Sequence, residues 1–174
     1  MTTYGHFDNQ ELGNSESDIS FLNGILTAFQ FINHKTDSGF DFSLKAYAKK
    51  TDNNLQDALQ TIYETVYEIK LSKVDELRVK LILEKWLFSF VPGINKFPSQ
   101  AFLVDKYDHF SHSRPSDRNE FVEEFVHTIM KAINPINIYR IDYLKTKLYV
   151  GSDNDILCFE TQDKIVLLSC SWDD

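Results

Sequence analysis

The chain has 174 residues, of which 43% are hydrophobic, with six glycines, four prolines and a formal net charge of -8. This length allows one domain with a substantial core, and the composition excludes a disordered, collagen-like or linker-rich chain. Because an acidic surface repels phosphates, we expect neither nucleic acid nor a membrane as a partner.

The acidic residues gather at the two ends of the sequence. Residues 1–41 hold six Asp and Glu against one Lys, and residues 151–174 again hold six against one. No secretory signal is visible and no apolar run is long enough to span a bilayer, so we expect a cytoplasmic protein.

Helical patterns dominate the first part of the chain. After a loosely docked arm at residues 1–16, apolar residues at helical spacing predict a helix from Ser17 or Asp18 to about Asn33. Residues 40–50 are ambiguous, because their apolar positions alternate as in a strand whereas their composition suits a short helix, which we favour.

The clearest helical signals lie between residues 52 and 91. Apolar residues first repeat at spacings of four and three, as in a helix–helix seam: Leu55, Leu59, Ile62, Val66 and Ile69. Residues 74–91 then become apolar on nearly every side, with Ser72 and Asp75 as a capping signal and Pro92-Gly93 as a stop. Because the joint is short, we predict an antiparallel helix hairpin; one continuous kinked helix is the alternative.

The second half begins with helical patterns and ends with strand patterns. Helices are predicted within residues 99–110 and from Asp117 to Ile133, the second ended by Asn134-Pro135. Alternating segments follow at 137–143, 147–151, 156–160 and 164–172, separated by short polar turns. We therefore expect a single α+β domain, with helices and their hairpin over the N-terminal two-thirds and a C-terminal β-meander of three to four strands.

The last hairpin has a predictable register. A turn centred on Gln162-Asp163 sets Cys158 against Leu167 and leaves Cys170 opposite Asp155, too far from Cys158 for a disulfide. Both cysteines are therefore expected to be reduced. One face of this hairpin is expected to pack against the helices and carries Leu157, Phe159, Val166, Leu168, Cys170 and Trp172.

Chemical motifs are sparse. Asp105, His109 and His112 would share one face of a helix and are the best candidates for a metal-binding protein or hydrolase, although the segment runs into a loop before Pro115. The sequence contains no glycine-rich phosphate loop and no recognisable nucleophile motif. Our main expectation is therefore no enzyme activity, no metal and no cofactor.

The acidic C-terminal sheet is the candidate partner-binding surface. Aromatic groups beside fixed charges are typical of protein interfaces, and the predicted strand ends and turns bring together Tyr149, Asp153, Asp155, Asp163, Trp172, Asp173 and Asp174. The alternative is that turns collect Asp for backbone reasons alone.

In its size, its acidity, its lack of a catalytic motif and its closing strand KIVLLSCSWDD, the chain resembles the immunity proteins of bacterial contact-dependent growth inhibition and related polymorphic toxin systems. The resemblance implies a cytoplasmic protein that binds a cognate toxin domain, often a basic RNase or DNase, and blocks it by charge and shape complementarity. A regulatory protein-interaction domain with an unrelated partner is a further alternative.

Overall fold

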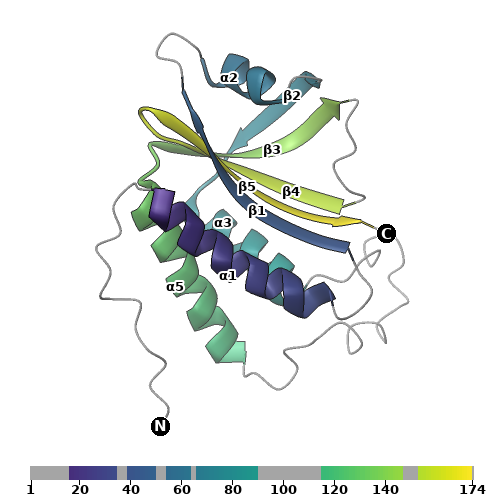
Figure 1. The fold of residues 1–174 in the computed structure, drawn as a ribbon, viewed down its shortest axis with the longest axis vertical. Coiled ribbons are helices and arrows are strands. Elements are labelled where there is room, and N and C mark those ends of the chain that lie inside the picture. Colours follow the sequence, from purple (N-terminus) through teal and green to yellow (C-terminus); the bar gives the residue numbers. More distant parts are fainter. Residues whose placement is uncertain are drawn as a thin grey trace.

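An antiparallel β-sheet lies at the centre of the structure (Figure 1). The computed structural model describes residues 16–34, 39–49, 54–63, 66–89, 115–146 and 153–173. Within these ranges the sheet has five strands: β1 (Gly39–Ala48), β2 (Val66–Lys73), β3 (Asn137–Thr146), β4 (Asp153–Glu160) and β5 (Lys164–Asp173). Their order is β1-β5-β4-β3-β2, so the two strands from the first half of the chain form the edges.

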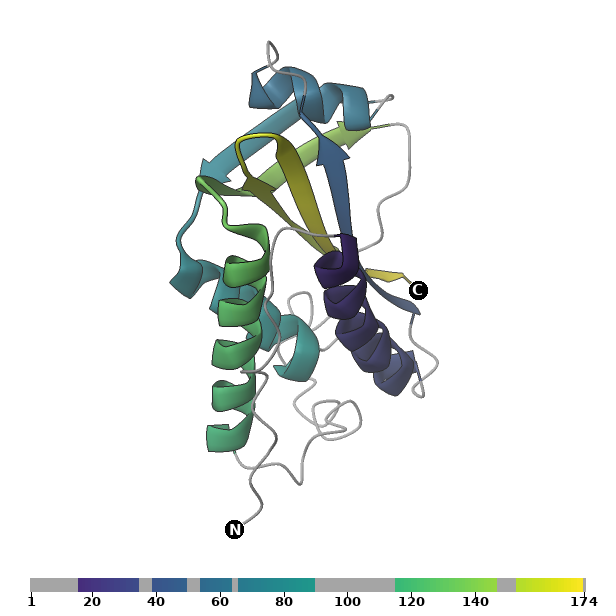
Figure 2. The ribbon, with the colours of Figure 1, turned by 60° about the vertical axis from the view of Figure 1, so that its left-hand side comes forward.

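The helices of the described residues cover the two faces of the sheet unequally. One face packs against α1 (Glu16–His34), α3 (Glu76–Glu84) with its π-helical extension η1 (Lys85–Ser89), and α5 (Pro115–Ile133). The short helix α2 (Leu55–Ile62) lies on the other face, above the sheet in Figure 2. In the described part of the chain, no helix is long and apolar enough to cross a membrane.

The alternation of side chains along β4 and β5 divides the interior into two apolar clusters. The larger cluster, on the side of α1, α3 and α5, contains Trp86 and Phe125 with Phe159 of β4. The smaller one joins Leu59 of α2 to the opposite face of the sheet. Because β4 and β5 each contribute side chains to both clusters, the middle of the sheet is buried on both sides.

The predicted register of the last hairpin is confirmed. Cys158 pairs with Leu167, and Asp155 with Cys170. All six residues predicted to face the helices lie in or against the larger cluster. Cys158 and Cys170 are buried free thiols, and they contribute to clusters on opposite faces of the sheet.

The predicted helix hairpin is wrong, as is a sheet confined to three or four C-terminal strands. Only the first part of the predicted seam, Leu55–Ile62, is helical, capped by the Asn54 side chain, which accepts from the Asp57 N–H at 2.9 Å. Val66–Lys73 is strand β2 instead. In this segment Ile69 and Leu71 both face the smaller cluster, so the apolar side chains recur at every second residue, as in a strand. The helical spacing of the upstream residues had obscured this pattern.

Residues 39–48 also form a strand, β1, rather than the short helix we favoured. Phe40, Phe42 and Leu44 alternate into the larger cluster while the strand pairs with β5 along its whole length. The outer edge of β1 is partly covered by α1. There, the Asn23 side chain accepts from the Leu44 N–H at 2.8 Å and donates to the Leu44 carbonyl at 2.7 Å, much as a neighbouring strand would.

The predicted helices near residues 17–33 and 117–133 are confirmed as α1 and α5, each starting slightly earlier. The predicted end of α5 at Asn134-Pro135 is confirmed, and Asn134 has φ 48°, a left-handed conformation that asparagine tolerates better than most residues. The predictions for the arm at residues 1–15, the stop at Pro92-Gly93, the helix within 99–110 and the strand at 147–151 lie outside the described residues.

Candidate partner-binding surface

Asp155, predicted to contact a partner, is buried beneath the sheet instead. Its side chain is 3% exposed and accepts hydrogen bonds from residues on two elements. Oδ2 accepts from Lys85 Nζ at 2.9 Å and from the Trp86 indole at 2.8 Å. Oδ1 accepts from Arg140 Nε at 2.9 Å, and Arg140 Nη2 lies 2.7 Å from the same oxygen. Asp155 therefore joins η1 to β3 and β4, and we call these four residues the Asp155 cluster.

The electrostatics of this cluster favour an ionised carboxylate. Burial alone would raise the pKa of Asp155, but hydrogen bonds from Lys85 and Trp86 and the charges of Lys85 and Arg140 outweigh it, so the pKa lies below its ordinary value. Arg140 also lies 3.8 Å from Asp142, whose carboxylate accepts from Ser72 of β2. The charges of the cluster are therefore engaged within the fold.

The π-helical turn η1 places two hydrogen-bond donors beside Asp155. Lys85 and Trp86 are neighbours in sequence, and both reach the same carboxylate oxygen. Trp86 also packs edge-on against Phe40 and Phe42 of β1, with ring centroids 6.5 and 6.2 Å apart. Isolated π-helical turns often mark positions where a side chain has a specific task. Here that task is to fix the end of α3 against the sheet.

The other described residues predicted for the partner surface do not form one patch. Asp163 is exposed in the turn between β4 and β5, whereas Asp153 and Trp172 lie opposite each other at the far end of these strands. At about 3.3 Å per residue, the two ends are about 25 Å apart. The Trp172 indole N–H is buried, and it has no hydrogen-bond partner among the described residues. Asp173 ends β5, and Tyr149 and Asp174 lie outside the described residues.

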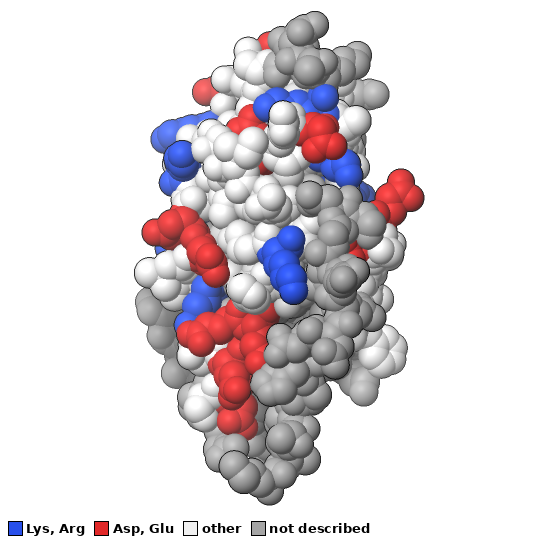
Figure 3. Space-filling view, turned by 90° about the vertical axis from the view of Figure 1, so that its left-hand side faces the viewer, with Lys and Arg blue, Asp and Glu red and all other residues white. Residues whose placement is uncertain are grey.

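Exposed acidic residues gather instead on the outer sides of α3 and α5. Carboxylates gather on the lower half of the face shown in Figure 3, over α5 and the start of α3. The exposed acids in these elements are Asp75, Glu76, Glu120, Glu123 and Glu124. We call this set the α3–α5 acidic surface. Residues 75–84 and α5 together carry seven Asp and Glu against four Lys and Arg.

One ion pair joins the two helices of this surface. Lys80 Nζ of α3 lies 2.5 Å from Glu123 of α5, and its hydrogen bond and charge hold the pKa of Glu123 below the ordinary value. Glu120 and Glu124 make no ion pair with any described residue. Both carboxylates are exposed. The sequence analysis placed no partner contact on these helices, and the excess of acids along the whole segment was the available signal.

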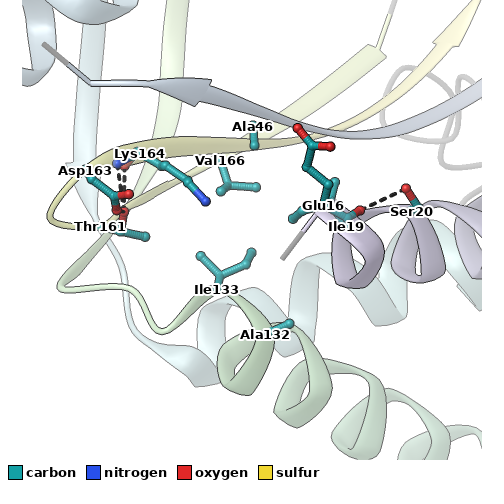
Figure 4. A pocket seen from close by; sticks show the side chains of 10 residues that line it. All are labelled: Glu16, Ile19, Ser20, Ala46, Ala132, Ile133, Thr161, Asp163, Lys164 and Val166. Atoms are coloured by element: carbon teal, nitrogen blue, oxygen red, sulfur yellow. Dashed lines mark hydrogen bonds between the residues drawn. The ribbon is translucent and has the colours of Figure 1, made fainter. Parts of the chain in front are cut away.

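A pocket of about 320 Å³ lies beyond the C-terminal end of α5 (Figure 4). Ile19, Ile133 and Val166 supply its apolar walls, and the Lys164 side chain points into it. Its hydroxyl groups serve the local structure: Ser20 donates to the Glu16 carbonyl, and Thr161 bonds within its own turn. Glu16, Asp163 and Lys164 on its walls give the pocket both signs of charge. The pocket lies between the C-terminal end of α5 and the turn that carries Asp163.

The alternative metal site cannot be placed, because Asp105, His109 and His112 lie outside the described residues. Within the described ranges, no three His, Cys, Asp or Glu residues are grouped so as to hold a metal ion. Burial raises the pKa of the Cys158 thiol to about 12 and also raises that of Cys170, so both thiols stay protonated near neutral pH.

Comparisons with known proteins found no matching family model, no similar curated protein and no similar solved structure.

Proposed function

We propose that this protein is a non-enzymatic immunity protein, which acts in the cytoplasm by binding a basic toxin domain through the α3–α5 acidic surface. The observation that carries the proposal is the pair of exposed carboxylates on Glu120 and Glu124, which form no ion pair with any described residue and lie beside the further acids of α3 and α5. A nuclease is the toxin class that fits best, because its own active-site surface must be basic to hold phosphates.

The physical argument concerns the rate of association. Carboxylates displayed together on two packed helices produce a local negative potential, which steers a basic protein toward this face. The same charges disfavour acidic proteins and nucleic acids as competitors. Steering of this kind weakens as salt is added, because the Debye length falls to about 8 Å at physiological ionic strength.

The first experiment identifies the partner. The purified chain is immobilised and exposed to the cytosolic proteins of the source cells, including those with toxin domains, at low and at high salt. Retained proteins are identified by mass spectrometry. We expect a basic protein that is released by salt and whose nuclease activity falls when the chain is added at equal concentration. Retention of acidic or salt-insensitive partners alone would contradict the proposal.

A pair of charge-reversal variants tests the surface itself. Glu120→Lys with Glu124→Lys should slow association with the captured protein by about tenfold at low salt and flatten its salt dependence. The matched control is Asp57→Lys with Glu68→Lys, which makes the same change in net charge at exposed positions of α2 and β2. Equal slowing by both pairs would show that net charge alone matters and would remove the α3–α5 acidic surface from the proposal.

A further inference from the structure

We infer that Leu77 and Leu81 form the apolar centre of the interface, and that they receive an apolar side chain of the partner that is flanked by Lys or Arg. This inference rests on the proposed function, because it takes the partner to be a basic protein. In this view the leucines provide the apolar contacts that hold the complex together, and the surrounding carboxylates speed its association.

The two leucines are unusual in α3. Leu77 is 62% exposed and Leu81 is 47% exposed, although both belong to the segment that the sequence showed to become apolar on nearly every side. Neighbouring positions on the other side of α3, Val79, Ile82 and Leu83, are buried. Leu77 and Leu81 are four residues apart, so they lie one above the other on the same side of the helix and form a continuous apolar strip.

The strip is presented by a fixed backbone. Asp75 caps the start of α3 by accepting from the Arg78 N–H at 2.9 Å, and the buried side chains of Val79 and Leu83 hold its middle. At its end, the Trp86 bond to Asp155 joins the following turn to the sheet. A partner that covers the leucines therefore pays little conformational entropy on the side of this protein.

The charges around the strip define what can cover it. Glu76 adjoins Leu77, and the Lys80–Glu123 ion pair links the helix to α5 with its exposed Glu120 and Glu124. An apolar contact placed here brings the partner's neighbouring side chains close to these carboxylates. Basic side chains would be stabilised at that rim, whereas a second copy of this chain would bring its own acids against them. Charge complementarity thus favours a basic protein over self-association.

The test uses the basic protein captured by the unaltered chain, purified, as the probe. Leu77→Gln with Leu81→Gln removes the apolar strip while keeping good helix formers. We expect the dissociation constant to rise at least tenfold, mainly through faster dissociation, while the association rate and its salt dependence stay close to those of the unaltered chain. The matched control is Ile136→Gln, which alters an isoleucine that is 65% exposed and lies before β3.

The outcomes separate this inference from the proposed function. If the leucine variant binds as tightly as the unaltered chain while charge reversal at Glu120 and Glu124 still slows association, the inference is wrong and the acidic surface stands. If no basic protein is captured in the first place, both fail. Sedimentation of the unaltered chain and of the leucine variant tests whether a second copy of this chain binds the strip instead. A dimer that the leucine variant abolishes would show that it does and would overturn the inference.

Discussion

The strongest prediction from the structure concerns Asp155→Asn. The substitution keeps the size of the side chain but removes the charge that faces Lys85 and Arg140, and the new amide N–H₂ must replace one acceptor oxygen. Asparagine can accept the Trp86 hydrogen bond or face Arg140, but its amide nitrogen cannot accept from the other donors. The variant should therefore leave positively charged groups without a partner beside a buried amide.

The expected size of the effect follows from exposure. Removing one member of a buried ion pair costs about 3–5 kcal/mol. The Lys85 and Arg140 side chains are 41% and 32% exposed, so water can solvate part of their charge when the carboxylate is lost. We therefore expect the free energy of unfolding to fall by about 3 kcal/mol, the lower end of that range.

Urea unfolding followed by circular dichroism measures this loss at pH 7. Asp153→Asn is the control, since Asp153 is a half-buried carboxylate two residues away on the same strand, and we expect it to stay within about 0.5 kcal/mol of the unaltered chain. A similarly small loss for Asp155→Asn would refute the view that this carboxylate fixes η1 to the sheet.

The pH dependence gives the same prediction a second readout. The folded pKa of Asp155 lies below its ordinary value of 3.8, so its ionised form stabilises the fold at any pH above that value. This stabilisation is lost as the pH falls through the folded pKa. The stability difference between the unaltered chain and Asp155→Asn should therefore be constant near neutral pH and shrink below about pH 4. A difference that grows on acidification would contradict the assigned charge state.

Two further predictions concern the sheet. Asn23→Ala should lower the free energy of unfolding by about 1–2 kcal/mol, because it leaves the Leu44 N–H and carbonyl at the β1 edge without their partner. Light scattering should also show more aggregation of this variant than of Asn154→Ala, which alters an exposed residue of β4. Cys158 and Cys170 should resist Ellman's reagent at pH 8 and react once urea unfolds the chain, because burial keeps both thiols protonated and inaccessible; rapid labelling of the folded protein would contradict this.

The C-terminal hairpin was predictable because its signals are local. The three-residue turn between Glu160 and Lys164 fixes the register of β4 and β5, and alternation then assigns each side chain to a face. Neither step requires knowledge of the rest of the chain. The same reasoning placed the C-terminal end of α5 before Asn134-Pro135, whereas the helix begins at Pro115, ahead of the predicted cap Asp117.

The segment around β2 was not predictable in this way. Ile62, Val66 and Ile69 continue the helical spacing of Leu55 and Leu59 by coincidence, and no Gly or Pro marks the change from helix to strand. What makes Val66–Lys73 a strand is its pairing with β3, more than sixty residues away in sequence, which no local pattern reveals. β1 is similar, because its pairing with β5 decided between two patterns that were locally balanced.

The candidate surface shows the same limit. Asp155 and Glu120 are both carboxylates with apolar residues nearby in sequence, yet one is buried in an ion-paired cluster and the other is exposed. Their difference depends on donors far along the chain: Lys85 lies 70 residues before Asp155. Composition therefore indicated an acidic protein, but only the tertiary structure separates the acids that stabilise the fold from those that can meet a partner.

These two groups of acids are nevertheless connected through α3. Asp155 holds Lys85 and Trp86, and these residues directly follow the helix that carries Leu77 and Leu81. Loss of the Asp155 carboxylate should loosen that helix and speed dissociation of the partner even at temperatures where the variant stays folded. Because Glu120 and Glu124 are unaffected by this change, the salt dependence of association should remain. We therefore expect Asp155 to act as a positioning residue for the proposed interface, and not as one of its contacts.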